Sequence, residues 1–374
     1  MNVIFTCGGT GGHINPAIAV ANLVRERHPG SKILFIGAKG HMEEQLVPKA
    51  GFDLKCLEIA GMVRGKSVKA IAKNVKTVAA TMKAVSDCKK IIRNFQPDVI
   101  IGTGGYACFP ALMAGSQMKI PTCVHESNAM PGLTTRLLAD RMDRVLVCFG
   151  ESAQRYKNPQ RVETVGMPIR REFIFGDREK ARKELGLGNE LLVVSAFGSL
   201  GARDMNETIA QVMKLEQKAG FPFRHIHATG KFGWEWMPDK VAQMGIKLQG
   251  SPIEMREYLY NMPTVMAAAD VIISRSGAST CNEVAASGTP AILIPSPNVT
   301  DNHQEKNASV LSNNGGAVLL LEKECTPQRL YDEIMALLTD EKRREEMRTK
   351  LRSSVILDSA ERICEILEGL AQKK

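Results

Sequence analysis

Short apolar runs rich in β-branched residues alternate along the chain with longer stretches of helical spacing. In the first half, the pattern predicts strands at Val3–Thr6, Lys32–Ile36, Val99–Ile101, Thr122–Val124 and Val145–Val147. In the second half, it predicts strands at Leu191–Ser195, Arg224–His227, Val271–Ile273 and Ala291–Ile294. This alternation is typical of right-handed β-α-β units around a parallel sheet. We therefore expect an α/β protein with doubly wound parallel sheets.

The two series of strands resemble each other. The stretch "DVIIGTGGYACFPALMAG" from Asp98 matches "DVIISRSGASTCNEVAASG" from Asp270, and "NVIFTCGGTGGH" matches "LLVVSAFGSLGAR". A chain of 374 residues is also long for one ordinary domain. We expect two similar Rossmann-like domains at 1–164 and 165–340, joined near 162–170 and facing each other across a cleft.

The charge is distributed unevenly. Residues 1–165 hold 22 Lys and Arg against 12 Asp and Glu, whereas the rest holds 27 against 28, so the whole excess of +9 lies in the first half. A one-sided basic charge predicts an anionic surface or ligand there. We do not expect nucleic acid, because aromatic residues are only 5% and no base-stacking motif occurs. Nine cysteines without C-x-x-C indicate reduced thiols, and the N-terminus lacks the basic region of a signal peptide.

A glycine-rich segment, "CGGTGGH" at 7–13, follows the first predicted strand. A dinucleotide-binding loop needs the spacing G-x-G-x-x-G and an acidic residue after the next strand, where this chain has Lys39. No G-K-[ST] follows either, so a P-loop is also disfavoured. With Asn15 as N-cap and Pro16 as the first helical residue, the segment would lead into a helix that attracts an anion. A tight turn before a capped helix is the alternative.

Three further glycine loops follow predicted strands, namely "GTGGY" at 102–106, "FGSLGA" at 197–202 and "SRSGAST" at 274–280. Together with the first loop they would line one cleft, because ligands bind at the carboxyl ends of parallel strands. His13 closes the first loop, where an imidazole suits general-base work, or it is a structural histidine. Glu283, near the start of a helix, can accept hydrogen bonds from a ribose diol, or it favours the helix N-terminus.

The polar segment "DNHQEKNA" at 301–308 has side chains at spacings that suit sugar hydroxyls, although it also reads as a polar helix start. No D-x-D occurs in the chain, and a divalent metal bridging a nucleotide diphosphate usually needs such a carboxylate pair. We therefore expect metal-independent chemistry, in which helix N-termini and Arg170 neutralise the diphosphate.

The segment 67–95 has an apolar stripe at helical spacing with lysines beside it. The stripe comprises Val68, Ile71, Val75, Val78, Met82 and Val85, and the lysines are Lys69, Lys73, Lys76, Lys83 and Lys90. Between residues 62 and 93 nine basic residues face one acid, a balance of 9 − 1 = +8. One interpretation is a core-facing stripe beside a solvated lysine face. The other is a helix that rests on anionic lipid headgroups.

Taken together and in this order, the motifs resemble the MurG family of UDP-GlcNAc-dependent transferases. The matching stretches are "GGTGGHINPA", "GTGGYACFPALMAG", "HESNAMPG", "GMPIR", "FGSLGAR", "SRSGASTCNEVAASGTPAILIPSP" and "DNHQEKNA". They extend over about residues 8 to 308. The resemblance implies a GT-B fold, with the acceptor and the membrane at the N-terminal domain and UDP-GlcNAc at the C-terminal domain. It also implies that the C-terminal helix, about 341–374, packs back on the first domain.

The resemblance also implies roles for individual residues. On the donor side it places Arg170 and Ser199 at the diphosphate, Glu283 at the ribose, and Gln304 and Asn307 at the GlcNAc. On the acceptor side it places His13, Thr10, Gly11, Gly12, Gly104, Gly105, Tyr106 and Asn128, with His125 and Glu126 supporting them. The chain departs from the usual motifs at Leu200, where the family commonly has Gln, and at Met167, where it has Asn. His303 stands where Gln is usual.

The implied reaction is an inverting transfer in peptidoglycan biosynthesis. It moves GlcNAc from UDP-GlcNAc to the 4-hydroxyl of MurNAc in undecaprenyl-pyrophosphoryl-MurNAc-pentapeptide, which converts lipid I to lipid II. His13 is the candidate base, UDP-GlcNAc is a substrate rather than a cofactor, and no metal is expected. Because the acceptor is a lipid, we expect a peripheral protein at the cytoplasmic face of the cell membrane, with Lys69, Lys73, Lys76 and Lys83 facing anionic lipid.

Other functions of the same fold stay open from the residues alone. A UDP-GlcNAc epimerase or a glycolipid glycosyltransferase would share the loops, although an epimerase has no need of the lysine-rich helix. A non-catalytic, membrane-associated nucleotide-binding protein is a different class. It would need glycine loops in one half only, whereas this chain has them in both.

Overall fold

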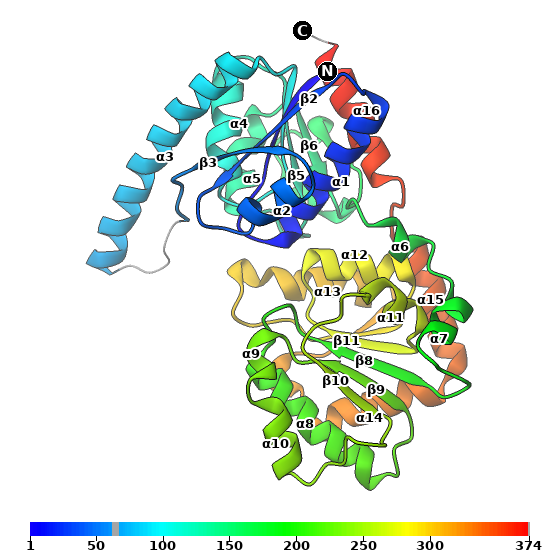
Figure 1. The fold of residues 1–374 in the computed structure, drawn as a ribbon. Coiled ribbons are helices and arrows are strands. Elements are labelled where there is room, and N and C mark those ends of the chain that lie inside the picture. Colours follow the sequence, from blue (N-terminus) through cyan, green and yellow to red (C-terminus); the bar gives the residue numbers. More distant parts are fainter. Residues whose placement is uncertain (62–66, 373–374) are drawn as a thin grey trace. The chain divides into compact units, whose positions relative to one another are not determined.

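The computed structural model describes residues 1–61 and 67–372, without the side chains of residues 68–71. The chain divides into two compact units (Figure 1). Unit 1 comprises Met1–Ile169 and Ile356–Lys374, and unit 2 comprises Arg170–Val355. The first change of unit thus falls at Ile169, inside the stretch 162–170 where the sequence pattern places the link.

Unit 1 is built on a parallel sheet. Within the described residues it has seven strands in the order β3-β2-β1-β4-β5-β6-β7. They are β1 (Asn2–Thr6), β2 (Lys32–Ala38), β3 (Asp53–Leu57), β4 (Val99–Gly102), β5 (Thr122–Glu126), β6 (Arg144–Val147) and β7 (Val162–Thr164). Alternate residues of β1 face opposite sides of the sheet, so that Val3 and Phe5 join one core cluster and Ile4 joins the other.

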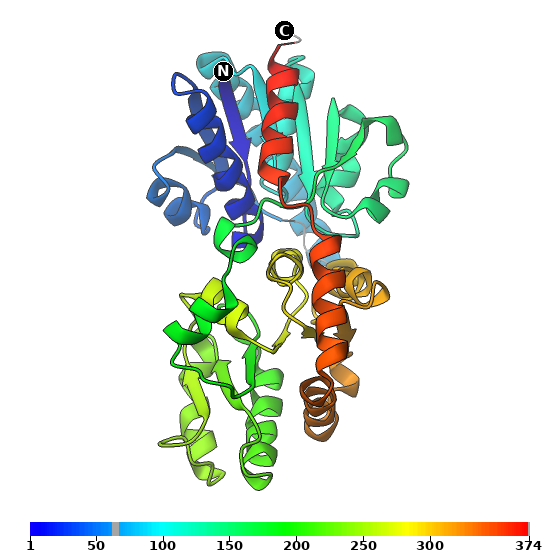
Figure 2. The ribbon, with the colours of Figure 1, turned by 90° about the vertical axis from the view of Figure 1, so that its right-hand side faces the viewer.

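Helices cover both faces of this sheet, as the parallel arrangement requires. They are α1 (Gly11–Arg27), α2 (Glu43–Lys49), α3 (Val68–Phe95), α4 (Cys108–Gln117), α5 (Leu133–Leu138) and α16 (Ser359–Ala371), with short 3₁₀ turns at Ala139–Arg141, Gly150–Arg155 and Pro159–Arg161. Helices α1 and α16 lie side by side on one face (Figure 2). Helices α3 and α4 pack together on the other face.

Unit 2 has a similar parallel sheet, in the order β10-β9-β8-β11-β12-β13 over the described residues. Its strands are β8 (Leu192–Ala196), β9 (Arg224–Ala228), β10 (Ile253–Arg256), β11 (Val271–Ser274), β12 (Ala291–Leu293) and β13 (Ala317–Leu319). Its helices are α6 (Arg171–Ile174), α7 (Arg178–Glu184), α8 (Arg203–Lys218), α9 (Lys231–Trp234), α10 (Met237–Gln243), α11 (Met262–Ala268), α12 (Ala278–Ser287), α13 (His303–Asn313), α14 (Pro327–Thr339) and α15 (Glu341–Ser354), with 3₁₀ turns at Thr300–Asn302 and Glu322–Glu324.

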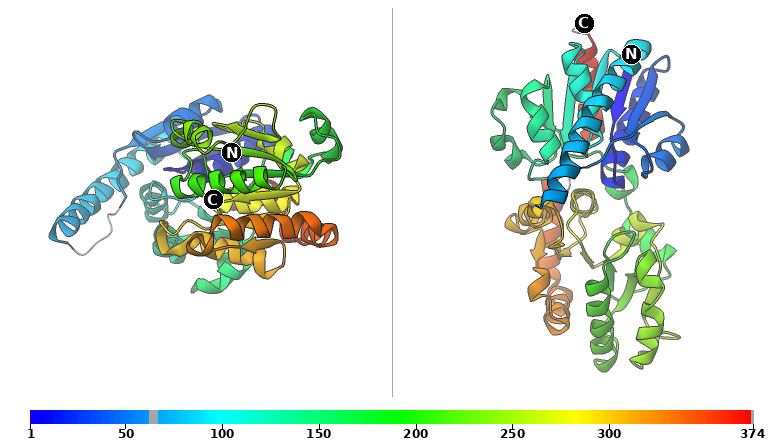
Figure 3. Two further views of the ribbon diagram at one scale, coloured as in Figure 1. Left: turned by 90° about the horizontal axis from the view of Figure 1, so that it is seen from below. Right: turned by 90° about the vertical axis from the view of Figure 1, so that its left-hand side faces the viewer.

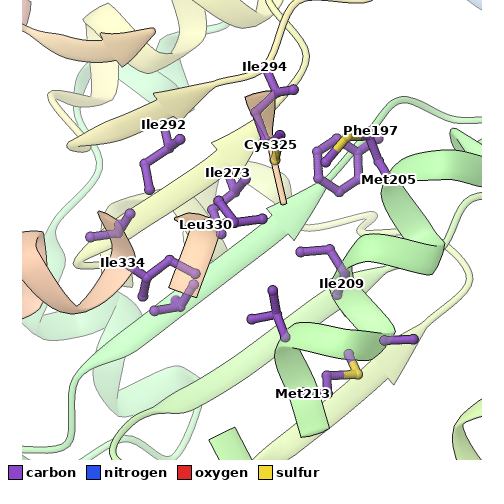
Figure 4. Close-up of a cluster of buried hydrophobic side chains, with 14 of the residues drawn as sticks. Phe197, Met205, Ile209, Met213, Ile273, Ile292, Ile294, Cys325, Leu330 and Ile334 are labelled. Atoms are coloured by element: carbon purple, nitrogen blue, oxygen red, sulfur yellow. The ribbon is translucent and has the colours of Figure 1, made fainter. Parts of the chain in front are cut away.

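The core of unit 2 lies where α8 and α14 cover one face of the sheet. Ile209 and Met213 of α8 meet Ile273 of β11 and Leu330 and Ile334 of α14 (Figure 4). All five side chains are fully buried. This packing removes the apolar stripes of both helices from water, which is the main stabilising term for such a layer.

The internal repeat in the sequence is also a structural repeat. Asp98, just before β4, accepts a hydrogen bond on Oδ2 from the Asn2 N–H at 2.8 Å. Asp270, just before β11, accepts one on Oδ2 from the Leu192 N–H at the same distance. Each aspartate thus anchors the start of the neighbouring strand, β1 in unit 1 and β8 in unit 2.

Helix α1 begins earlier than the sequence predicts. It starts at Gly11, after the N-cap Thr10, and Pro16 lies inside it, so Asn15 is not the N-cap. The Thr10 carbonyl accepts bonds from the N–H groups of His13 and Ile14. Proline at this position lacks the N–H that would bond to the carbonyl of Gly12, and its ring crowds that carbonyl, so Pro16 is a weak point within the helix. His13 is therefore a helical residue rather than the last residue of a loop.

The C-terminal segment, about 341–374, was expected to pack back on the first domain as one helix. It consists of two helices, α15 and α16. Helix α15 belongs to unit 2, where Arg348 donates to the carbonyl oxygens of Gly288 and Ala269 and Leu351 is fully buried. The chain returns to unit 1 at Ile356, and α16 packs on α1 there. The packing back on the first domain is therefore a property of residues 356–374 alone and not of the whole stretch from 341.

Helix α3 is long, and its two ends have different surroundings. Toward its C-terminal end Val85, Cys88 and Ile92 are buried against the sheet, whereas its N-terminal part extends away from the sheet of unit 1 (Figure 3). Within the described residues no helix combines the length and the apolar character needed to cross a bilayer.

Candidate functional site

In each unit the glycine loops follow strands that are neighbours in the sheet. In unit 1 the glycine loops at 7–10 and 103–106 come after β1 and β4, and the loop at 127–132 comes after β5. In unit 2 the loops at 197–202 and 275–277 come after β8 and β11, and the segment before α13 follows β12. Strand order reverses between β1 and β4 and again between β8 and β11, and such switch points are where open α/β sheets bind ligands.

His13 is held by the loop after β4. Its Nδ1 lies 3.2 Å from the carbonyl oxygen of Thr103, and the Thr103 hydroxyl donates to the carbonyl oxygen of His13 at 2.7 Å. A carbonyl can only accept, so Nδ1 carries the proton and the lone pair of the neutral ring is on Nε2. This is the tautomer that a general base acting through Nε2 needs.

The two glycine loops of unit 1 approach each other as closely as glycine allows. A β-carbon on Gly104 would lie 2.5 Å from His13 Nδ1, and one on Gly105 would lie 2.4 Å from the carbonyl oxygen of Gly8. Both glycines also have positive φ angles, +107° and +84°. The glycines at 104 and 105 therefore permit the contact between Thr103 and His13, while Gly11 and Gly12 form the first turn of α1 after the exposed Thr10.

Glu126 organises the loop after β5. One carboxylate oxygen accepts from the backbone N–H and the side-chain amide of Asn128, at 3.0 and 3.1 Å. The other accepts from the Gly132 N–H at 2.9 Å and from the Thr135 hydroxyl at 2.6 Å. Glu126 is buried, and each of its carboxylate oxygens accepts two hydrogen bonds. It therefore fixes Asn128 and the turn before α5.

His125 is buried completely, and its Nε2 lies 2.8 Å from the carbonyl oxygen of Gly166. Burial lowers the pKa of this imidazole, so the neutral form is favoured. His125 therefore joins the end of β5 to the segment after β7.

In unit 2, Ser199 lies on the exposed loop after β8. Its carbonyl oxygen accepts from the Lys231 N–H at 3.1 Å. A β-carbon on Gly201 would lie 2.1 Å from the carbonyl oxygen of Thr229, so this loop packs tightly on the one after β9. Leu200 is 55% exposed beside Ser199. An apolar side chain there offers no hydrogen bond, so phosphate binding by this loop would depend on Ser199 and backbone N–H groups.

Glu283 lies in α12 near Arg170. Burial raises the pKa of its carboxyl from 4.5 to about 7, and the positive charge of Arg170 partly opposes that rise. The Arg170 guanidinium stacks over the Phe173 ring, 4.9 Å from its centroid. A carboxyl group with a pKa near neutral pH, beside an exposed arginine, is a candidate for binding a polar, anionic ligand.

Gln304 and Asn307 both tie α13 to the loop after β11. The side-chain oxygen of Gln304 accepts from the Ser296 N–H at 2.9 Å, and its carbonyl accepts from the Ser276 hydroxyl at 2.8 Å. Asn307 is fully buried and donates to the Ser276 carbonyl at 3.2 Å. Asn307 thus lies beneath the loop, whereas Gln304 is only partly buried. Asp301 and Asn302, just before α13, both have positive φ angles.

Within residues 1–61 and 67–372, the structure contains no cluster of three or more His, Cys, Asp or Glu side chains suited to a metal ion. Sequence reasoning missed two residues that shape unit 1. Thr103 orients His13, and its place between the glycines of "GTGGY" was the available signal. Glu43 binds the backbone of Gly9, and no motif in the sequence marks it.

Comparison with known families gives the class of protein. Residues 3–147 match the glycosyltransferase family 28 N-terminal domain, and residues 192–363 match the glycosyltransferase family 28 C-terminal domain. The crystal structure of Acinetobacter baumannii MurG covers 98% of this chain and 99% of its own, with a TM-score of 0.78 and 24% identity. The chain is therefore a glycosyltransferase of the GT-B fold, with two Rossmann-like domains.

Curated relatives define the family more closely. A UDP-N-acetylglucosamine--N-acetylmuramyl-(pentapeptide) pyrophosphoryl-undecaprenol N-acetylglucosamine transferase of Acetivibrio thermocellus is 40% identical, over 100% of this chain and 99% of the relative. The transferase of the same name from Bacillus cytotoxicus is 37% identical over the full length of both. The chain belongs to this family of N-acetylglucosaminyltransferases. A UDP-GlcNAc 2-epimerase of Neisseria meningitidis, at 15% identity and a TM-score of 0.68, shares the fold alone.

Proposed function

We propose that this protein transfers GlcNAc from UDP-GlcNAc to the 4-hydroxyl of MurNAc in undecaprenyl-pyrophosphoryl-MurNAc-pentapeptide, converting lipid I to lipid II in peptidoglycan synthesis. The observation that carries the proposal is the pair of loop sets at the switch points of the two sheets, in a chain of this family. In unit 1 the loop after β4 orients His13 of α1, and in unit 2 the Glu283 carboxyl, whose pKa is raised to about 7, lies near Arg170.

Unit 2 is the proposed donor side. Ser199 and Arg170 would contact the diphosphate, Glu283 the ribose hydroxyls, and Gln304 the GlcNAc. Asn307 would act through the Ser276 loop that it supports. The sequence has no D-x-D motif, and in this proposal Arg170 and backbone N–H groups at helix starts would balance the charge of the diphosphate.

Unit 1 is the proposed acceptor side. The 4-hydroxyl oxygen attacks the anomeric carbon of GlcNAc, its proton passes to His13 Nε2, and the bond from that carbon to UDP breaks with its electron pair leaving on the diphosphate. The Thr103 carbonyl would stabilise the imidazolium that forms, because it accepts from Nδ1. Asn128 and Tyr106, on the two loops beside His13, would contact the acceptor.

The membrane side is proposed to be α3. Val75, Val78 and Met82 are 64%, 52% and 59% exposed, which is inconsistent with a stripe that faces the core along its whole length. Lys73, Lys76 and Lys83 are exposed beside them. Apolar side chains flanked by lysines suit the interface of an anionic membrane. The side chains of Val68, Lys69 and Ile71 lie outside the described residues. We propose peripheral binding at the cytoplasmic face of the membrane.

Radiolabelled UDP-GlcNAc tests the reaction directly. Incubated with the protein and a short-chain polyprenyl-pyrophosphoryl-MurNAc-pentapeptide, it should release UDP and label the lipid in equal amounts. Without acceptor, UDP release should be negligible. Conversion of UDP-GlcNAc to UDP-ManNAc without acceptor would identify an epimerase instead, and binding of UDP-GlcNAc without turnover under either condition would indicate a non-catalytic protein.

A further inference from the structure

Glu43, the first residue of α2, is a charged residue enclosed in unit 1. It has no exposed surface. Its Oε1 accepts from the Ala38 N–H at 2.9 Å, and its Oε2 accepts from the Gly9 N–H at 3.2 Å. Ala38 ends β2 and Gly9 belongs to the "CGGTGGH" loop. A buried carboxylate needs such donors, and here both come from segments outside α2.

The backbone around Glu43 is shaped to admit its carboxylate. A β-carbon on Gly8 would lie 2.5 Å from Glu43 Oε1, and one on Gly37 would lie 2.7 Å from its Cγ. Any other residue at these two positions would displace the side chain. Gly9, which donates to the carboxylate, has a φ of +89°, so this part of the loop has a backbone conformation that few residues adopt.

His41, two residues earlier, contacts the other glycine loop of unit 1. Its Nε2 lies 2.8 Å from the Tyr106 hydroxyl, and the two rings meet edge to face with centroids 6.0 Å apart. The Tyr106 ring lies over the first loop as well, because its Cε1 is 3.8 Å from where a β-carbon on Gly9 would be. The segment 41–43 therefore holds both loops, through a buried carboxylate and an exposed imidazole.

We infer that Glu43 is a positioning residue for GlcNAc transfer, assisted by His41, because it fixes the backbone of the loop that leads into His13. The inference rests on the proposed function. The charge of Glu43 is not required to pack α2, because the fully buried Val47 of the same helix supplies the contact with the core. What the charge adds is a bond from α2 to Gly9, four residues before His13.

The test is Glu43→Gln, which keeps the shape but offers one acceptor and one donor to two N–H groups. We expect kcat to fall about tenfold or more, since small misplacements of a catalytic group are costly. The dissociation constant for UDP-GlcNAc should change less than about twofold, as expected for a site in unit 2, and amide exchange of residues 7–13 should become faster. Glu43→Asp, which keeps the charge but is one methylene shorter, should resemble Glu43→Gln.

The matched control is Glu44→Gln, an exposed neighbour on the same helix, which should leave kcat and exchange unchanged. A folded Glu43→Gln protein with wild-type kcat, or a Glu43→Asp protein with full activity, overturns the inference. If Glu43→Gln does not fold, kcat of His41→Ala is measured instead, because His41 is exposed. Wild-type kcat in that variant would overturn the inference. If the wild-type protein itself transfers no GlcNAc, the proposed function fails, and exchange at residues 7–13 still reports separately whether Glu43 fixes this loop.

Discussion

Nδ1 of His13 faces the carbonyl oxygen of Thr103 at 3.2 Å, and the Thr103 hydroxyl in turn donates to the carbonyl oxygen of His13. The pair joins the start of α1 to the loop after β4. A backbone carbonyl thus performs the orienting task that a carboxylate performs in many catalytic histidine pairs. Because a carbonyl has no full charge, it favours the imidazolium less than a carboxylate would, which suits a base that must accept and then release a proton.

Removal of the imidazole tests this assignment. In His13→Ala, kcat should fall by about 10²–10⁴-fold, which is the usual contribution of a general base. The dissociation constant for UDP-GlcNAc should change little, because the proposed donor residues are all in unit 2. Steady-state kinetics with the lipid-linked acceptor and calorimetric binding of UDP-GlcNAc measure the two quantities.

A suitable control for this experiment is His28→Ala. His28 is also in unit 1, where its Nε2 lies 2.9 Å from Glu368 Oε1 on α16. Its loss should leave kcat near the wild-type value. If His13→Ala retains kcat within about threefold of wild type, His13 is not the base.

If Glu283 binds the ribose as proposed, binding of UDP-GlcNAc should depend on pH. Burial raises the pKa of the Glu283 carboxyl to about 7, so at pH 6 only about one molecule in ten has the carboxylate form, which in the proposed complex would accept two ribose hydrogen bonds. If that form binds best, affinity for UDP-GlcNAc rises with pH up to about 7 and then levels off. Below pH 7 the dissociation constant should increase by at most about tenfold per pH unit.

Calorimetry with UDP-GlcNAc between pH 5.5 and 8.5 measures this dependence, and the ligand suits it because its diphosphate is a diester without an ionisation near neutrality. Glu283→Gln should bind weakly at every pH and show no transition near 7. Glu184→Gln, an exposed glutamate of unit 2, should keep the wild-type curve. A wild-type affinity that is flat across pH 7 would contradict a ribose-binding carboxylate.

The strands that the sequence pattern predicted are those at the centre of each sheet. All nine predicted strands overlap observed ones, whereas β3, β7, β10 and β13 were missed, and these four are the edge strands of the two sheets. Central parallel strands are buried on both faces and read as continuous apolar runs. Edge strands are covered less completely. In β3, Asp53 and Lys55 interrupt the apolar pattern and are exposed.

The parts of the candidate site that lie within a sequence motif could be predicted. The parts that depend on contacts between residues far apart in the sequence could not. The glycine loops, His13 and Glu126 stand within recognisable stretches. By contrast, the bond from Glu43 to Gly9 spans 34 residues, and the one from Asn307 to Ser276 spans 31. Such contacts depend on how helices dock on the sheet, and local spacing does not encode that. For the same reason the spacing along α3 could not show which part of its stripe is exposed.

Membrane binding through α3 should depend on its lysines. Changing Lys73, Lys76 and Lys83 together to Gln removes about 3 kcal/mol of attraction to an anionic surface, at about 1 kcal/mol each. Partitioning onto phosphatidylglycerol-containing vesicles should fall by about two orders of magnitude at low salt. Co-sedimentation across a series of anionic lipid and salt contents measures it.

The control removes three exposed lysines of unit 2, Lys183, Lys218 and Lys323, and so makes the same change in net charge. Partitioning should then stay close to wild type. Equal losses in the two triple variants would show that net charge alone governs binding. Vesicle binding that changes with neither the anionic lipid content nor the salt concentration would contradict an electrostatic contact.

A buried cluster of polar side chains on β8, β9 and α8 should govern stability at acid pH. Ser195 Oγ, on β8, lies 2.7 Å from both His225 Nε2 and His227 Nδ1, and His225 Nδ1 lies 2.8 Å from Glu216 Oε1. All four residues have no exposed surface. Burial, and the neighbouring His225, lower the pKa of His227 to about 3, so that it stays neutral in the folded protein over most of the acid range.

Because the unfolded chain protonates His227 near pH 6.5 and the folded protein does so only near pH 3, the unfolded state binds more protons between these values. The free energy of unfolding should therefore be unaffected by His227 above pH 6.5 and should fall by up to about 1.4 kcal/mol per pH unit below it.

This change of the unfolding free energy with pH can be measured by urea unfolding between pH 4.5 and 7.5, with hydrogen exchange at β8 and β9 as the signal for unit 2. In His227→Asn, the amide can still contact Ser195. This variant should be less stable than the wild type at pH 7.5, but below pH 6.5 its unfolding should take up about one proton fewer. An unchanged slope in His227→Asn would mean that His227 is protonated in the folded protein, and that the network has room for a charge.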